Sequence, residues 1–135
     1  MKAYLAIGKN SRKRMEPFVN AISECLEKFH INHSIFADRY SFSSNQEKEM
    51  MQQAMSDIDA CDLFIAEVSE KAIGVGVETG YAKGKRKTII YLRRADAEHS
   101  TTGSGVSDYQ LIYADAGDLK AGLEKIIILW LSQRA

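Results

Sequence analysis

The sequence is poor in cysteine and proline, and these shortages exclude whole classes of protein. Among 135 residues there are two cysteines, Cys25 and Cys61, with no C-x-x-C pair and no metal-ligand spacing. The chain therefore has no disulfide framework, and we expect both thiols to be small buried hydrophobic groups. The single proline, Pro17, suits the first turn of a helix.

The chain also lacks a net charge and a long apolar run. Its 18 Lys and Arg balance 18 Asp and Glu, which argues against a nucleic-acid polymer as the main partner. No apolar run approaches the length of a membrane span, and the first one is too short for a signal peptide. We therefore expect a single cytoplasmic domain, residues 1–135, with no membrane partner.

Short apolar runs alternate with helical patterns along the chain, which predicts a parallel α/β sheet. The expected strands are Lys2–Gly8, Asn32–Asp38, Asp62–Val68, Lys87–Leu92 and Tyr109–Asp115. The expected helices are 11–29, 46–59, 78–85 and 118–133, and 93–108 is expected to be a long polar loop. Five such strands favour a flavodoxin-like three-layer sandwich with the strand order 2-1-3-4-5.

This topology places a ligand where the strands end, near the switch point between the first and third strands. The segment "AIGVGVETGYAKGK", Ala72–Lys85, lies on that edge, and its glycines lack the G-x-G-x-x-G spacing of a dinucleotide site. They flank a single acid, Glu78. This acid either favours the macrodipole at a helix start or is a carboxylate of the ligand site. In the second case Gly74 and Gly76 leave room for a ligand, and Glu78 can attack an anomeric carbon.

The stretch "DLFIAEVSEKAIGVGVETGYAKGKRKTIIYL" resembles the signature of the nucleoside 2-deoxyribosyltransferase family, which includes a branch of 2'-deoxynucleoside 5'-monophosphate N-glycosidases. The family's leading Asp and its G-x-G-x-E-x-G-x-A motif are matched by Asp62, Gly74, Gly76, Glu78, Gly80 and Ala82. The first strand, "AYLAIG", and the segment Ser104–Asp108 are also similar to family segments, so the resemblance covers most of the chain.

The resemblance implies an enzyme that cleaves the N-glycosidic bond of a deoxynucleoside or its 5'-monophosphate. Glu78 would attack C1' and form a glycosyl ester, which water or a second base would resolve. Tyr4 would hold Glu78 in attacking geometry, unless it is only a packed strand tyrosine. Ser100 would complete the site of a neighbouring subunit, which implies a homodimer or a higher homo-oligomer. The alternative for Ser100 is a solvated loop serine.

At one position the chain departs from the family's pattern. Where the family has an Asp or Ser for the sugar's 5' group, this chain has Ala72. The basic stretch Gly8–Arg14 offers a replacement, since Gly8, Ser11, Arg12 and Arg14 at a helix start could hold a 5'-phosphate. The alternative is a solvated loop.

Two acids remain. Glu67, at the end of the third expected strand, is a candidate second carboxylate that assists base departure or activates water, or else it pairs with a basic neighbour. Asp38, after the second strand, is a candidate for base recognition.

The competing interpretation is a non-catalytic, flavodoxin-like nucleotide-binding or sensor module, in which Glu78 hydrogen-bonds a ribose. A flavin is not supported, because the loop after the first strand lacks a Ser/Thr-rich phosphate cradle, and we predict no cofactor and no metal. The sequence leaves open the base, the 2' and 5' groups of the sugar, and hydrolysis versus transfer.

Overall fold

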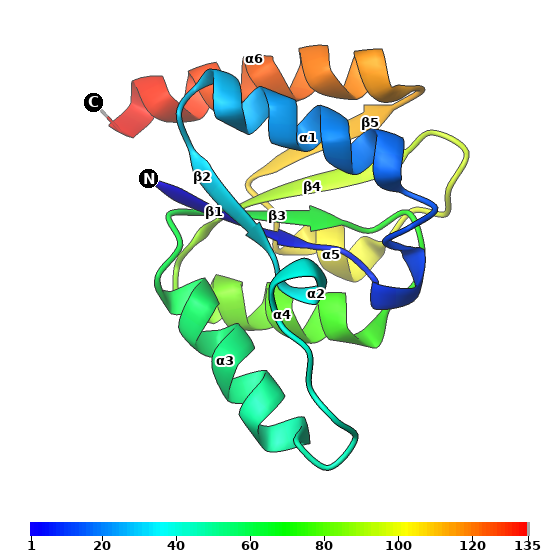
Figure 1. Cartoon of the computed structure of the whole chain (residues 1–135). Coiled ribbons are helices and arrows are strands. Elements are labelled where there is room, and N and C mark those ends of the chain that lie inside the picture. The colour runs from blue at the N-terminus through cyan, green and yellow to red at the C-terminus, as the bar shows by residue number, and fades with distance from the viewer. Residues whose placement is uncertain (135) are drawn as a thin grey trace.

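A five-stranded parallel sheet between two helical layers forms the computed structural model of the chain, which describes residues 1–134 (Figure 1). The strand order is β2-β1-β3-β4-β5, which confirms the predicted topology. The strands are β1 (Lys2–Ala6), β2 (Asn32–Ile35), β3 (Leu63–Glu67), β4 (Thr88–Arg94) and β5 (Tyr109–Tyr113).

Helices cover both faces of this sheet (Figure 1). They are α1 (Glu16–Lys28), α2 (Phe36–Arg39), α3 (Glu47–Asp59), α4 (Ile73–Gly84), α5 (Thr101–Gly105) and α6 (Ala116–Arg134), with a 3-10 turn η1 (Lys9–Ser11) after β1. Helices α1 and α6 lie on one face, and α3 and α4 lie on the other. Across residues 1–134, no helix is both long enough and apolar enough to cross a membrane.

Strand β3 is buried on both faces, which explains why its sequence is apolar without alternation. Leu63 and Ile65 pack in the core beneath α1 and α6, whereas Phe64 and Ala66 pack in the core beneath α3 and α4. The register pairs Ala6 with Ala66. Because the strands are parallel, the loops that follow β1, β3 and β4 meet at one edge of the sheet.

Several boundaries differ from the expected ones, and the first long helix begins at Glu16, not at residue 11. Helix α4 begins at Ile73, not at Glu78, although its first turns carry Gly74 and Gly76. Burial of Val75, Thr79 and Ala82 stabilises these turns against the weak helix propensity of glycine. The second strand ends early and continues as α2, and the expected loop 93–108 contains α5. Glu78 is therefore an interior residue of α4, and the helix-start interpretation of this acid is wrong.

Candidate active site

A hydrogen bond connects the first strand to α4. The hydroxyl of Tyr4 donates to Oε2 of Glu78. Tyr4 is 1% exposed and its ring stacks on Phe64 at 5.4 Å between centroids, so the position of the phenol is fixed by the core. Glu78 is half-buried, and within residues 1–134 no group hydrogen-bonds to its other oxygen, Oε1. One oxygen is held and the other remains available.

Burial perturbs both members of this pair. It raises the pKa of Glu78, and the Tyr4 hydrogen bond opposes the rise because it stabilises the ionised carboxylate. Burial, together with the charge of Glu78, also raises the pKa of Tyr4. The phenol therefore remains protonated at neutral pH and acts as the donor. A partly desolvated carboxylate with a fixed donor is suited to nucleophilic attack.

A second carboxylate, Asp57 of α3, lies near Tyr4. Its Oδ1 accepts hydrogen bonds from Gln53 Nε2 at 2.9 Å and from the Tyr40 hydroxyl at 3.3 Å. Its Oδ2 is buried without a hydrogen-bond partner among residues 1–134, and its charge contributes to the raised pKa of Tyr4. An unsatisfied buried acceptor costs about 1–3 kcal/mol, which a hydrogen-bond donor of a ligand would offset.

Aromatic rings lie beside Asp57. Phe36, Tyr40 and Phe42 have ring centroids 4.8–6.0 Å apart, and Phe36 also packs against the core cluster that contains Tyr4. The Tyr40 hydroxyl connects these rings to Asp57. Flat aromatic faces beside a carboxylate acceptor are suited to a heterocyclic base, which stacks and donates hydrogen bonds.

The structure does not bring Glu67 to Glu78. Glu67 is 2% exposed and follows the alternation of Leu63 and Ile65, so it faces the α1 and α6 layer, across the sheet from Tyr4 and Glu78. Tyr113 Oη donates to its Oε2 at 2.6 Å, and the Ser69 amide donates to its Oε1 at 2.6 Å. Burial raises the pKa of Glu67, and these hydrogen bonds oppose the rise. Its contacts are those of a paired carboxylate within the core.

We expect Tyr113→Phe to lower the free energy of unfolding by about 1–3 kcal/mol at pH 7, because Glu67 Oε2 would remain buried without its donor. Urea denaturation measures this loss. The loss should shrink at low pH, where Glu67 is protonated and no buried charge needs the donor. Tyr109→Phe is the matched control, since that hydroxyl bonds the exposed Gln133. Equal losses in the two variants would contradict the assignment.

The predicted anion ligands Arg12 and Arg14 already have carboxylate partners. Arg12 binds Asp38 through Nε–Oδ1 at 3.0 Å and Nη2–Oδ2 at 2.8 Å, and it also contacts Glu16. Arg14 pairs with Glu70 of the loop after β3. The two ion pairs connect the loop after β1 to α2 and to the loop after β3. The two ion pairs thus join loops at this edge of the sheet, and the Asp38 carboxylate is already bound by Arg12.

The glycines at this edge of the sheet differ in how much space surrounds their Cα atoms. A Cβ at Gly8 would lie 3.0 Å from Ser11 Oγ and 3.1 Å from Ala72 Cβ, so a side chain there would push two loops apart. Ser11 itself is 5% exposed. A Cβ at Gly74 or Gly76 would meet no atom within 4 Å. The first turn of α4 is thus open, and no side chain caps it.

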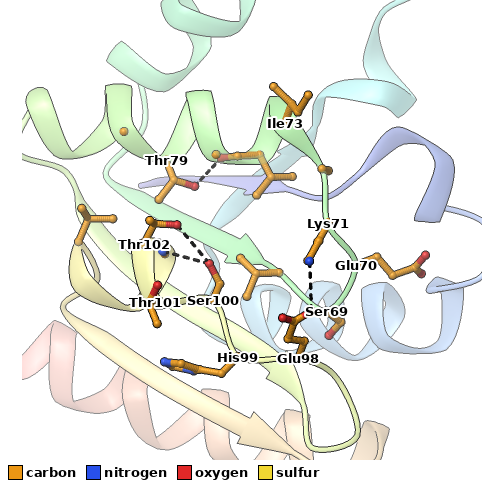
Figure 2. Close-up of a pocket in the computed structure, with 17 residues that line it drawn as sticks. Ser69, Glu70, Lys71, Ile73, Thr79, Glu98, His99, Ser100, Thr101 and Thr102 are labelled. Carbon is orange, nitrogen blue, oxygen red and sulfur yellow. Dashed lines mark hydrogen bonds and ion pairs between the residues drawn. The ribbon is translucent and has the colours of Figure 1, made fainter.

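A cavity of about 970 Å³ lies between α4 and α5 (Figure 2). Ala72, Gly76 and Thr79 line it from the α4 side, and Ser100 to Gly103 line it from the α5 side. Ser100 therefore faces a cavity of its own chain, where its Oγ accepts a hydrogen bond from the Gly103 amide at 3.2 Å. Glu78 is not part of this lining and leaves α4 on the side of Tyr4.

Sequence analysis missed Asp57, because one acid among the polar residues of 46–59 looks like any solvated helix position. Its one signal was adjacency to the buried helix positions Ala54 and Ile58. Among residues 1–134, no three His, Cys, Asp or Glu side chains gather in a way that could hold a metal ion.

Comparison with known proteins gives matches in sequence and in fold. Residues 3–123 match the model of the nucleoside 2-deoxyribosyltransferase family. A 5-hydroxymethyl-dUMP N-hydrolase of Esox lucius is 33% identical over 72 residues, which are 53% of this chain and 50% of that protein. The match thus spans about half the length of that curated relative.

Two solved structures share the fold at low identity. The CMP N-glycosidase of Clostridium botulinum superposes with a TM-score of 0.70 at 19% identity, covering 92% of this chain and 99% of the other. A 2-deoxyribosyltransferase of Bacillus psychrosaccharolyticus gives 0.68 at 13% identity, covering 89% and 90%. The family model extends over nearly the whole sheet and its helices. The chain belongs to the nucleoside 2-deoxyribosyltransferase family.

Proposed function

We propose that this chain cleaves the N-glycosidic bond of a deoxynucleoside or of its 5'-monophosphate, with Glu78 as the nucleophile. The observation that carries the proposal is the Tyr4–Glu78 hydrogen bond, which holds one oxygen of a half-buried carboxylate. Family membership supports it, as do the names of the relatives, which include an N-hydrolase and an N-glycosidase.

The chemistry follows from the carboxylate. Glu78 Oε1 attacks C1' of the sugar, the bond from C1' to the base nitrogen breaks, and its electron pair leaves with the base. The transition state resembles an oxocarbenium ion, which the carboxylate stabilises by its negative charge. The resulting ester then reacts with water in hydrolysis, or with the nitrogen of a second base in transfer, and Glu78 is regenerated.

Asp57 and the aromatic rings are the proposed base subsite. A base stacked near Phe36 and Tyr40 would present an edge to Asp57 Oδ2, the buried oxygen without a partner. An acceptor at this position favours a base that donates a hydrogen bond there. If Asp57 instead carries a proton, the same oxygen can donate it to the base and assist its departure.

The start of α4 is the proposed subsite for the sugar's 5' group. Its first-turn amides are not capped by a side chain, and such amides bind phosphate oxygens. Ala72 contributes no polar atom, and Arg12 and Arg14 are engaged by Asp38 and Glu70. Any 5'-phosphate would therefore be bound chiefly by backbone amides, with a smaller contribution from the arginines than the sequence suggested.

We also propose that the chain acts as at least a homodimer in which the Ser100 segment reaches a neighbour's site. In support, Ser100 caps the start of α5, and the next residue, Thr101, is exposed at the surface. Ser100→Ala tests the role. A loss of base release that mixing with Glu78→Gln chains restores would support a shared site, because some mixed dimers would combine an intact Ser100 with an intact Glu78 in one site.

The test of the function is direct product analysis. The protein is incubated with deoxynucleosides, ribonucleosides and their 5'-monophosphates, with and without a second free base, and the products are separated by chromatography. Free base without an acceptor indicates hydrolysis, and base exchange indicates transfer. Tight binding of a nucleotide that is recovered unchanged would support the sensor module and would overturn the proposal.

We expect Tyr4→Phe to slow base release at pH 7 by about 10- to 100-fold, the value of one hydrogen bond to a charged group. In the unaltered chain, the Tyr4 hydrogen bond lowers the pKa of Glu78. Its removal in Tyr4→Phe should therefore shift the acid limb of the kcat/KM profile to higher pH. The pH profile measures both effects. Tyr81→Phe is the control, because that hydroxyl of α4 bonds the exposed Asp59. An unshifted acid limb would show that Tyr4 does not tune Glu78.

A further inference from the structure

Glu70 binds one of the cations that the sequence offers for a phosphate. It lies in the loop between β3 and α4, and its Oε1 is 2.5 Å from Nη2 of Arg14. The Arg14 hydrogen bond lowers the pKa of Glu70, and the charge of Arg94 and a contact with Ser11 act in the same direction, against the effect of burial. Glu70 is therefore ionised at neutral pH, and its carboxylate occupies this arginine as a bound anion would.

The Glu70 ion pair lies beside the proposed subsite for the sugar's 5' group. Glu70 is two residues before Ala72, which precedes the first turn of α4, and both residues line the cavity at α4. A Cβ at Gly8 would lie close to both Ser11 and Ala72, so the segment that carries Arg14 adjoins the start of α4. In Figure 2 the Glu70 side chain leaves its loop on the side away from α5.

Three other cations around this subsite also have acidic partners. The pairs are Arg12 with Asp38 and Glu16, Lys71 with Glu98, and Arg94 with Asp96. Their positive charge is thus balanced within the chain. A 5'-phosphate carries a charge of about −2 at pH 7, so it would have to displace an acid from an arginine or bind without one. A 5'-hydroxyl meets no such cost.

We propose that Glu70 is a specificity residue that disfavours a 5'-phosphate, so that the site prefers substrates whose 5' group carries no charge. Glu70 holds the Arg14 guanidinium away from the ligand, and its own negative charge repels a phosphate at the start of α4. The inference rests on the proposed function and narrows its substrates to nucleosides. In this respect the chain would differ from the relatives that are named for dUMP and CMP.

Ligand binding tests Glu70 without turnover. Two chains carry Glu78→Gln, which blocks the proposed reaction, and one of them also carries Glu70→Gln. Calorimetric titration gives the dissociation constants of the four common deoxynucleosides and of their 5'-monophosphates. With Glu70→Gln we expect monophosphate affinity to rise about 10- to 100-fold, the value of one hydrogen bond to a charged group, while deoxynucleoside affinity stays unchanged. The gain should shrink at high salt, which screens the freed charge.

Glu16→Gln is the matched control in the same Glu78→Gln chain. It removes the same charge from the same edge, but Arg12 stays bound to Asp38 and no arginine is freed. We expect it to leave the preference between the two ligand types unchanged. Adding Arg14→Gln to the Glu70→Gln chain should remove most of the gain, because the freed guanidinium is its main source. Only surface ion pairs are lost, so melting curves should show folded chains.

The outcomes separate this inference from the proposed function. Monophosphate affinity that does not rise in Glu70→Gln, or that rises equally in Glu16→Gln, would overturn the inference. Tighter binding of monophosphates than of deoxynucleosides before Glu70 is changed, or no binding of any of these compounds, would also overturn it. If Glu70→Gln produced the expected gain but the unaltered chain released no base from any substrate, the inference would stand and the proposed function would fail.

Discussion

Glu78→Gln is expected to lower kcat for base release by about 1000-fold or more, since substitution of a covalent nucleophile removes the chemical step itself. The neutral amide keeps the shape of Glu78 and can still accept the Tyr4 hydrogen bond. It cannot form the glycosyl ester. Intact mass spectrometry after acid quench should therefore show a sugar adduct on the unaltered chain, mapped to the peptide that contains Glu78, and none on the variant.

The same substitution should not harm the fold. Burial raises the pKa of Glu78, so the folded chain favours its protonated form more than the unfolded chain does. Ionisation of Glu78 therefore lowers the free energy of unfolding. This loss begins as the pH rises past the pKa of Glu78 in the unfolded chain, and it is complete above the pKa of Glu78 in the folded chain. Glutamine lacks this cost. At pH 7 the variant is expected to melt at the same or a higher temperature, and at pH 4 the difference should be smaller.

Glu49→Gln is the control for the charge change, because Glu49 is an exposed acid of α3. It is expected to release base at the unaltered rate. If Glu78→Gln kept that rate, or if the adduct mapped to another peptide, Glu78 would not be the nucleophile. A variant that is inactive because it is unfolded would show itself in the melting curve.

The fold was predictable because its signal is local. Each strand is a short apolar run, each long helix has a 3.6-residue apolar period, and their alternation leaves few topologies for five parallel strands. The proximity of Tyr4 and Glu78 was predictable only through the family resemblance, because the two residues are 74 positions apart. Once β1 and α4 are placed on the sheet, the contact follows from the geometry.

Where both faces of a strand are apolar, the sequence could not predict which face of the sheet each side chain points to. Strand β3 shows no alternation, so its sequence does not reveal that Glu67 faces α1 and α6 rather than α4. The partners of the arginines were hidden for a related reason. Arg12 and Asp38 are 26 positions apart, and a cation in an edge loop has the same sequence pattern whether it binds a ligand or a neighbouring acid.

The second large effect is expected for Asp57, which the sequence did not single out. Asp57→Asn should lower kcat for base release by about 100-fold, the lower end of what an acid or base group contributes. The amide retains an acceptor for Tyr40 and Gln53, whereas it can neither carry a proton nor hold a negative charge beside the base. Asp59→Asn, on the same helix and exposed, is the matched control.

A series of substrates with different leaving groups distinguishes a catalytic role of Asp57 from a structural one. If Asp57 assists departure of the base, the defect of Asp57→Asn should shrink for a deoxyribosyl substrate whose leaving group is a weak base and needs no proton. If Asp57 only braces α2 and α3, the defect should be the same for every leaving group and should accompany a lower melting temperature. The buried oxygen Oδ2 favours the first outcome, since a purely architectural carboxylate would have both oxygens paired within the chain.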